Sequence, residues 1–384
     1  MDLFEFQGKR LFYEAGIPTP HSWVAADVDE ANEIAAAQGM PLAVKAQVLT
    51  GGRGKSGGVV IVRDNAQFVS VAEQLFWLTV NGRRAEHLLI ERAVDVAREF
   101  YLAITLDRTA RRPVLLFSAH GGVDIEHLAR DDPAAMVRLP VDPLAGLEQA
   151  QIDRVVEEAG KAQPLPEAAQ QMLARVVVNL ARLYHDYEAT LVEINPLALT
   201  TEGELLALDA KVTLDDNALP RHLELEELRT FANARERRAH LAGVTYVSLD
   251  GEIGVIGNGA GLVMSVLDLI DAGGGNAGDF CDVGGGARAG AVRSAIDIVL
   301  ADEHVKALLV SIFGGITRGD EVARGVLEGL EASDRVVPVV VRLAGTGAEE
   351  GRKLLAASGR TGLTVVGSLE EAVTCVVAAA GGGS

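Results

Sequence analysis

A run of glycine, arginine and lysine residues forms the first segment whose composition suits phosphate binding. It reads Thr50-Gly-Gly-Arg-Gly-Lys-Ser-Gly-Gly58 and includes Gly54-Lys55-Ser56, the triplet that ends a Walker A motif. That motif also needs a glycine where this chain has Leu49, and a helix after the loop. Here a strand, Val59 to Arg63, is expected instead. We therefore reject Walker A and predict a loop between two strands, whose amides and the cations Arg53 and Lys55 cover a polyphosphate.

Charged residues in the neighbouring strands are the next candidates for contact with a nucleotide. Lys45 lies inside the apolar strand expected from Leu42 to Val48. Burying a lysine there is costly unless it is paired, so we interpret Lys45 as a phosphate contact; a lysine snorkelling from a strand edge is the alternative. Glu91 ends one expected strand and Glu99 begins the next. Their carboxylates could hold the ribose or amino group of a nucleotide, or could simply be solvated.

The residues on either side of Glu202 have the pattern of a β-hairpin. With its turn there, residues pair across the hairpin when their numbers add up to 404, so Asn195 should face Asp209. Glu193 projects from the same face as Asn195. One carboxylate and one amide oxygen suit Mg²⁺, which completes its shell with water and phosphate oxygens. A strand pair without an ion is the alternative, and Pro196 favours an edge strand.

From Gly251 onward, short apolar strands alternate with glycine turns and helices, which predicts a parallel α/β sheet with its ligands at the carboxyl ends of the strands. The turn Gly257-Asn-Gly-Ala-Gly261 is not a dinucleotide fingerprint, because that motif needs glycine where the chain has Leu262. The turn Phe313-Gly-Gly-Ile-Thr-Arg-Gly-Asp320 predicts a helix whose first amides, at Ile316 and Thr317, favour an anion. Tight turns without a ligand are the alternative.

Composition limits the class of protein. The 384 residues include 35 Lys+Arg and 54 Asp+Glu, a net charge of −19, which argues against nucleic acid and an anionic membrane as partners. No uncharged apolar run of about 18 residues exists, so no membrane span is expected. Two cysteines cannot form a disulfide framework, and the first residues lack a signal-peptide pattern. We expect a cytoplasmic protein of two to three domains.

Taken together, these motifs resemble the β subunits of succinyl-CoA synthetase, a succinate–CoA ligase, over almost the whole chain. The matching strings are Lys-Ala-Gln-Val, Gly-Gly-Arg-Gly-Lys-Ser-Gly-Gly, Glu-Ile-Asn-Pro-Leu, Asn-Gly-Ala-Gly-Leu, Asp-Val-Gly-Gly-Gly-Ala and Ile-Phe-Gly-Gly-Ile-Thr-Arg. The resemblance implies an α/β protein: an α+β ATP-grasp domain (1–222, with a smaller lid-bearing subdomain at 21–95) followed by a flavodoxin-like parallel α/β CoA-ligase domain (244–384). The Glu- and Arg-rich residues 223–243 are interpreted as a helical linker between them, or as an ordinary surface helix.

The resemblance also implies the reaction ATP + succinate + CoA ⇌ ADP + phosphate + succinyl-CoA, through a phosphohistidine on a partner α subunit and an acyl phosphate. CoA would bind mainly to that partner, in an αβ or α₂β₂ complex. The implied nucleotide-binding residues are Lys45, Gly52, Arg53, Gly54, Glu91, Val94 and Glu99. The implied Mg²⁺ ligands are Asn195 and Asp209, and the implied dicarboxylate site, shared with the α subunit, is Asn258, Gly315, Ile316 and Thr317. Glu193 would contact the phosphohistidine.

The sequence leaves several alternatives open. Ala210 stands where many of these β subunits have glycine, a variation also met in malate–CoA ligase β chains, so malate competes with succinate as the acid. A nucleotide-binding regulatory subunit without catalysis is a second alternative. A nicotinamide-dependent oxidoreductase is a third, and Leu262 argues against it. The choice between ATP and GTP, and the role of His120, are also open.

Overall fold

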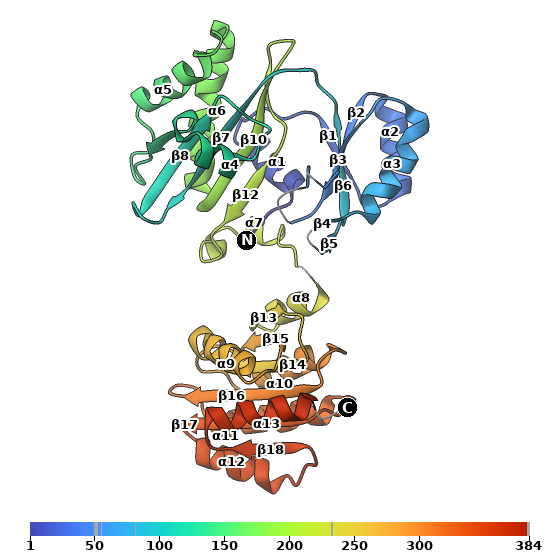
Figure 1. Ribbon diagram of the computed structural model, residues 1–384, viewed down its shortest axis with the longest axis vertical. Helices are drawn as coiled ribbons and strands as arrows, with labels where there is room; N and C mark the ends of the chain where they lie inside the picture. The colour runs from blue at the N-terminus through green and yellow to red at the C-terminus, as the bar shows by residue number, and fades with distance from the viewer. Residues whose placement is uncertain (50–52, 55, 81, 232, 382–384) are drawn as a thin grey trace. The chain divides into compact units, whose positions relative to one another are not determined.

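The computed structural model describes residues 1–49, 53–54, 56–80, 82–231 and 233–381. The chain divides into two compact units, Met1–Thr230 and Phe231–Ser384, shown in Figure 1. Among the described residues, no helix is long and apolar enough to cross a membrane.

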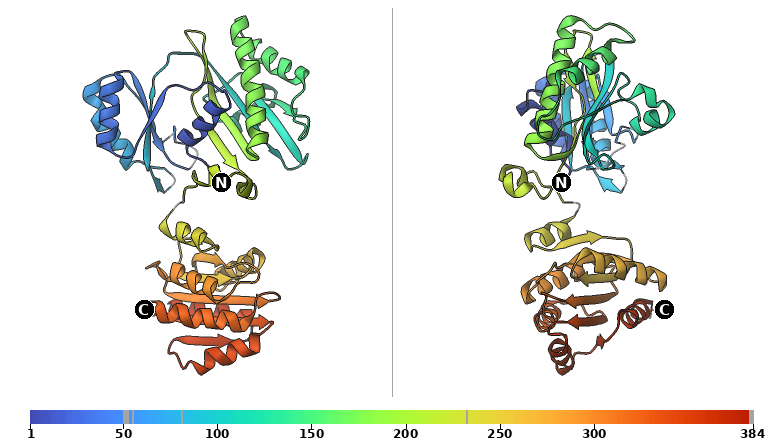
Figure 2. Two further views of the ribbon diagram at one scale, coloured as in Figure 1. Left: turned by 180° about the vertical axis from the view of Figure 1, so that it is seen from behind. Right: turned by 90° about the vertical axis from the view of Figure 1, so that its left-hand side faces the viewer.

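The first unit contains a four-stranded antiparallel sheet in the order β1-β6-β2-β3. Its strands are β1 Ser22–Ala25, β6 His87–Arg92, β2 Leu42–Gln47 and β3 Val59–Val62. Helices α2 (Val28–Gln38) and α3 (Asn65–Trp77) cover one face, where Val44, Phe68 and Ile90 are buried together (Figures 1 and 2). Because side chains alternate along a strand, Lys45 and Glu91 lie on the other face. A short pair follows α3, β4 Thr79–Val80 and β5 Arg83–Arg84.

The second sheet of this unit has six strands in the order β11-β10-β7-β8-β9, with β12 also paired to β10. They are β7 Val96–Asp107, β8 Arg112–Ser118, β9 Val137–Pro140, β10 Ala189–Thr200, β11 Leu205–Ala207 and β12 Lys211–Leu214. Helices α5 (Gln149–Gly160) and α6 (Glu167–Asp186) pack on one face, over a core that includes the stacked rings of Phe100 and Phe117. The shorter helices are α4 Ile125–Asp131, η1 Pro133–Ala135, η2 Leu219–Arg221 and α7 Leu223–Glu226.

Strand β10 is internal and not an edge strand, which corrects the expectation drawn from Pro196. It pairs with β7 on one side and with β11 and β12 on the other. Its register against β7 shifts between Ile194 and Leu197. Proline has no N–H to donate to the ladder, and this break lets the strand include Pro196 without losing its place inside the sheet.

Helix α1 (Glu5–Glu14) lies between the two sheets, as Figure 1 and the left view of Figure 2 show. Leu11 and Phe12 are buried in the core of the six-stranded sheet. Glu5 and Lys9 are four residues apart and therefore share a face of the helix, and this face contacts the four-stranded sheet. One face of this amphipathic helix thus packs in an apolar core, and the face with Glu5 and Lys9 packs against charged side chains of the four-stranded sheet.

The second unit is a six-stranded sheet in the order β13-β15-β14-β16-β17-β18, parallel except for β13. The strands are β13 Thr245–Ser248, β14 Ile253–Gly257, β15 Ala277–Asp282, β16 Ala307–Gly314, β17 Val339–Gly345 and β18 Leu363–Val366. Helices lie on both faces (Figure 2), so the predicted parallel α/β architecture is confirmed. The helices are α8 Ala234–Leu241, α9 Ala260–Ala272, α10 Ala289–Leu300, α11 Gly319–Ala332, α12 Ala348–Ala357 and α13 Leu369–Gly381. The carboxyl ends of β14 and β16 are adjacent.

Candidate functional site

Charged side chains from three elements of the first unit meet in one buried cluster. Lys45 on β2 donates to Glu5 Oε1 at 2.9 Å and lies 2.6 Å from Glu91 Oε2 on β6. Lys9 on α1 lies 3.0 Å from Glu5 Oε1 and 2.5 Å from Glu91 Oε1. Both ammonium groups also donate to the carbonyl oxygen of Leu208. Lys45 is therefore a buried, paired cation, not a lysine that snorkels from a strand edge.

The glycine-rich loop reaches the same cluster through Arg53. Its guanidinium lies 2.7 Å from Glu5 Oε2 and donates to Asp209 Oδ1 at 3.1 Å. Asp209 follows Leu208 directly, so the loop and the segment after β11 meet at this point. Two other loop residues expected to cover phosphate, Gly52 and Lys55, lie outside the described residues.

The charges of this cluster balance one another: three cations (Lys9, Lys45 and Arg53) face three carboxylates (Glu5, Glu91 and Asp209). Burial raises the pKa of Glu5, but the charges of the three cations outweigh it and hold that pKa well below its usual range. Burial lowers the pKa of Lys45, and the two glutamates more than offset this, so its pKa is raised. Glu5 and Lys45 are thus held ionised, whereas burial lowers the pKa of Lys9 and raises that of Asp209.

The predicted hairpin register is confirmed on both sides of the two candidate metal ligands. Leu197 pairs with Ala207 and Glu193 pairs with Lys211, and in both cases the residue numbers add up to 404. Between these pairs the ladder is open, and the backbone bond there runs from the N–H of Leu208 to the carbonyl of Pro196, at 3.0 Å. The residues expected to hold a metal thus lie in an unpaired part of the hairpin.

A glycine loop after β8 fixes Asn195 and Glu99. Asn195 Oδ1 accepts from the N–H of Gly122 at 2.8 Å, and its Nδ2 donates to the carbonyl of Val123 at 3.2 Å. Glu99 lies against the same loop, because a Cβ at Gly122 would sit 2.2 Å from Glu99 Oε2. Gly122 also has a φ of +67°, a backbone conformation that favours glycine.

The donor types in this region suit Mg²⁺. Asn195 offers an amide oxygen with a second lone pair and Asp209 offers a carboxylate that is 41% exposed. Nowhere in the described part of the chain do three or more His, Cys, Asp or Glu side chains form a group that could hold a metal ion. A metal with few protein ligands, completed by water and phosphate, fits this arrangement better than zinc or a caged calcium.

Glu193, on the same strand as Asn195, is held by a hydroxyl. Tyr101 on β7 donates to Glu193 Oε2 at 3.0 Å. Burial raises the pKa of Glu193, and the charge of Lys211 and the bond from Tyr101 offset only part of that effect. The carboxyl of Glu193 therefore keeps its proton to a higher pH than an ordinary glutamate does.

A second group of predicted residues assembles in the other unit, at the carboxyl ends of β14 and β16. The Asn258 carboxamide donates to Phe313 O and accepts from Phe313 N, both at 2.9 Å. It also donates to Thr317 Oγ1 at 3.2 Å, and the same hydroxyl accepts from Gly286 N at 2.9 Å. Ile316, in contrast, is exposed. Asn258 and the Gly315–Thr317 turn are therefore brought together.

The helix expected at Ile316 and Thr317 begins later, so that part of the prediction was wrong. Helix α11 starts at Gly319, whose N–H donates to Thr346 O at 2.9 Å. A Cβ at Gly319 would lie 2.8 Å from Ala348 Cα. Close packing against the turn after β17 fixes where the helix starts, and the residues at 315–317 form a turn before it.

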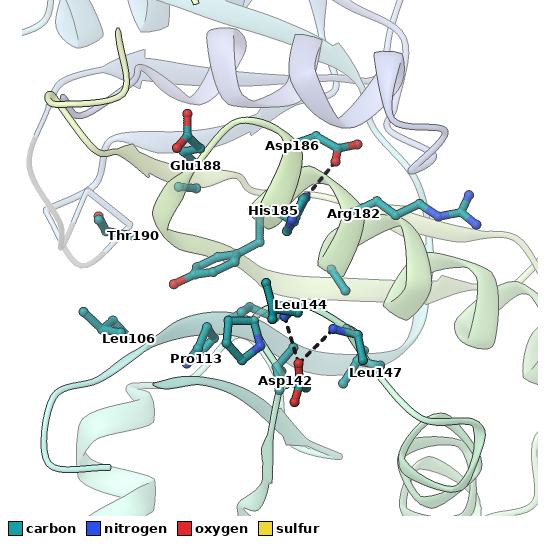
Figure 3. Close-up of a pocket in the computed structure, with 18 of the residues that line it drawn as sticks. Leu106, Pro113, Asp142, Leu144, Leu147, Arg182, His185, Asp186, Glu188 and Thr190 are labelled. Atoms are coloured by element: carbon teal, nitrogen blue, oxygen red, sulfur yellow. Dashed lines mark hydrogen bonds and ion pairs between the residues drawn. The ribbon is translucent and has the colours of Figure 1, made fainter. Parts of the chain in front are cut away.

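The first unit also has a cavity of about 580 Å³ elsewhere, between the end of β7, the start of β10 and α6. Figure 3 shows Leu106, Pro113, Leu144 and Leu147 around it, with His185 and Arg182 at one side. None of the predicted site residues that the structure describes lines this cavity. It is therefore separate from the charged cluster.

Sequence reasoning missed three residues of the candidate site. Glu5, Lys9 and Tyr101 were not predicted, although Glu5 and Lys9 have the four-residue spacing of one helix face. Of the predicted nucleotide residues, Gly54 lies in the turn after Arg53, and Val94 lies in the connection between β6 and β7. No local pattern in the sequence shows that the charged face of α1 packs against β2 and β6.

Two protein families match the chain. The ATP-grasp domain matches residues 2–199, and the CoA-ligase family matches residues 256–378. The two matches correspond to the first and second units of the fold.

Curated relatives match almost end to end. The β subunit of a succinate–CoA ligase (ADP-forming) from Rubrobacter xylanophilus is 47% identical, over 93% of this chain and 92% of its own length. A succinate–CoA ligase (GDP-forming) β subunit from Thermus thermophilus is 44% identical over 92% and 93%. Among solved structures, ATP citrate lyase from Methanothrix soehngenii is similar in fold, with a TM-score of 0.77 and 21% identity over 99% of this chain and 98% of that one.

Proposed function

Because the chain belongs to the family of β subunits of succinate–CoA ligase, we propose that it supplies the Mg·ATP site of this ligase and acts with an α subunit. The overall reaction is ATP + succinate + CoA ⇌ ADP + phosphate + succinyl-CoA. The observation that carries the proposal is the buried cluster in which Lys45, Arg53 and Glu91 meet beside Asp209. Succinate as the acid and ATP as the nucleotide are supported by the names of the relatives.

In this proposal, the cations of the cluster hold the nucleotide. Lys45 and Arg53 turn from Glu5 and Glu91 to the phosphates, which is favourable because a phosphate offers charge-assisted hydrogen bonds to both. Asn195 and Asp209 hold Mg²⁺, and this ion neutralises charge on the phosphate oxygens. The nucleoside would extend from the cluster at Glu91 on β6 towards Val94, in the connection to β7, and Glu99 on β7.

The proposed transfer runs through a histidine of the α subunit. An imidazole nitrogen forms a bond to the γ-phosphorus as the bond to the ADP oxygen breaks. A succinate carboxylate then takes the phosphoryl group, and the CoA sulfur displaces phosphate from the resulting acyl phosphate. Glu193 is proposed to accept a hydrogen bond from the imidazole, since its carboxylate is held by Tyr101 and has capacity left.

The second unit is proposed to contribute Asn258 and the Gly315–Thr317 turn to the dicarboxylate site, shared with the α subunit. Amide and hydroxyl donors at the ends of parallel strands suit a carboxylate ligand. CoA is proposed to bind mainly to the α subunit, in an αβ or α₂β₂ complex. Cys281 and Cys375 are free thiols, as expected for a protein that acts in the reducing cytoplasm.

Phosphoryl labelling of the reconstituted complex tests the proposal. The chain is mixed with its α subunit and [γ-³²P]ATP, and [α-³²P]ATP serves as the control. We expect an acid-labile label on a histidine of the α subunit, removed by succinate and CoA. A complex that forms but takes no label from [γ-³²P]ATP would overturn the proposal. Comparing kcat/KM for succinate and malate identifies the dicarboxylate substrate, since a site that hydrogen-bonds a hydroxyl discriminates strongly between two acids that differ by it. The same comparison for ATP and GTP identifies the nucleotide.

A further inference from the structure

Lys9 is the most completely enclosed cation of the charged cluster. Its side chain is 2% exposed. Its ammonium group contacts Glu5 Oε1, Glu91 Oε1 and the carbonyl of Leu208, at 3.0, 2.5 and 2.8 Å. An ammonium group has three donors, so each of them has an acceptor. No donor of Lys9 is left over for a ligand.

Lys45 has the same three partners but a different position. It contacts Glu5, Glu91 and the Leu208 carbonyl as Lys9 does, yet its side chain is 8% exposed and that of Arg53 is 11% exposed. Arg53 contacts Asp209, whose side chain is 41% exposed, and Lys45 shares its partner Glu5 with Arg53. These two cations can therefore reach an incoming ligand, whereas Lys9 cannot.

The difference in exposure between Lys9 and the other two cations matters because the cluster holds three cations and three carboxylates. If Lys45 and Arg53 both turn to phosphates, Glu5 and Glu91 keep one cation between them, and that cation is Lys9. A buried carboxylate that loses all its partners is strongly destabilising. Without Lys9, the two glutamates would hold back Lys45 and Arg53, and the nucleotide would have to compete for them.

We propose that Lys9 is a positioning residue of the nucleotide site: the permanent counter-ion that holds Glu5 and Glu91 while Lys45 and Arg53 transfer to the phosphates. This inference rests on the proposed function. Lys9 also fixes the backbone beside the metal ligands, because the carbonyl it binds belongs to Leu208, whose N–H donates to Pro196 O. Leu208 precedes Asp209, and Pro196 follows Asn195.

Calorimetric titration of the full chain with Mg·ADP tests the role of Lys9. Lys9→Met keeps most of the side-chain volume and removes the charge, and we expect its Kd to rise on the order of 10- to 100-fold. Arg10→Met is the matched control on the next residue of α1, because Arg10 is 67% exposed and pairs with Glu14 of its own helix. Its Kd should stay within about twofold of the wild type, as expected for an exposed pair. In the complex with the α subunit, Lys9→Met should raise KM for ATP and leave KM for succinate unchanged.

Two further variants separate charge balance from packing. Lys9→Met combined with Glu5→Gln removes one charge of each sign, and we expect it to bind Mg·ADP more tightly than Lys9→Met alone. Glu5→Gln by itself frees Lys45 and Arg53 from one partner and should bind at least as tightly as the wild type, which tests the proposal even if Lys9→Met does not fold. A normal Kd for Lys9→Met, a double variant no better than it, or weaker binding by Glu5→Gln would overturn the inference. Failure of the wild type to bind Mg·ADP would instead overturn the proposed function.

Discussion

Removing the hydroxyl of Thr317 should destabilise the second unit at the carboxyl ends of β14 and β16, where the dicarboxylate is proposed to bind. This buried hydroxyl accepts from Gly286 N at 2.9 Å and from Asn258 Nδ2 at 3.2 Å. Thr317→Val keeps the branched shape and removes the acceptor. Asn258 Nδ2 retains its bond to Phe313 O, so the main loss falls on the N–H of Gly286.

The size of the effect follows from these contacts. A lost hydrogen bond costs about 1 kcal/mol, and a donor left without a partner about 1–3 kcal/mol. We therefore expect the free energy of unfolding of the second unit to fall by about 2–3 kcal/mol, which corresponds to a Tm lower by about 5–10 °C for a unit of this size. Because Asn258 loses one of its supports, KM for the dicarboxylate should rise, whereas the Kd for Mg·ADP should not change.

Calorimetry of the full chain measures the Tm, and amide hydrogen exchange at Gly286 reports the lost bond directly. Thr317→Ser keeps the hydroxyl and should retain the protection of that amide. Thr374→Val removes an exposed hydroxyl that donates only to Glu370 O of its own helix, so its Tm should stay within about 1 °C of the wild type. A Thr317→Val protein with unchanged Tm and unchanged exchange at Gly286 would refute the reasoning.

Three more predictions follow from the geometry. Asp209→Ala should weaken Mg·ADP binding on the order of tenfold or more while changing metal-free ADP binding much less; equal Kd values with and without Mg²⁺ would count against the metal site. Tyr101→Phe removes a bond that lowers the pKa of Glu193, so the acidic limb of the kcat profile of the complex should move to higher pH; an unmoved limb would mean that Glu193 does not need its charge. Burial raises the pKa of Asp279 to about 7, so the folded state binds one proton more than the unfolded state between about pH 4 and 7 and the second unit loses stability as the pH rises through this range. Asp279→Asn should flatten this dependence in urea unfolding curves, and a profile that keeps its slope would contradict the assignment.

Several features of the fold could be predicted because they depend on neighbours in the sequence. The apolar run from Leu42 to Val48 placed Lys45 within a strand. The alternation of Glu193 and Asn195 with apolar residues, with a turn at Glu202, gave the hairpin register that the pairs Leu197–Ala207 and Glu193–Lys211 confirm. Strands closed by glycine turns predicted the parallel sheet of the second unit. Each of these rests on a short apolar run, a period of two residues or a local turn preference.

Other features depended on packing between distant segments. Helix α11 starts at Gly319 and not at Ile316, because the turn after β17 lies against it. Pro196 lies inside an internal strand, since a register shift against β7 accommodates it. Local propensity cannot show either effect, because the residues responsible lie far away in the sequence.

The sequence alone determined which chemistry this protein can perform: a glycine-rich loop with cations, an amide and a carboxylate across one hairpin, and glycine turns at strand ends are all properties of short segments. Only the tertiary structure decided how the charges are shared. Lys9 pairs with Glu91 across 82 positions, and Arg53 with Asp209 across 156. Such contacts arise when the burial of Leu11 and Phe12 fixes α1 between two sheets, so that apolar packing brings together ions that no local pattern connects.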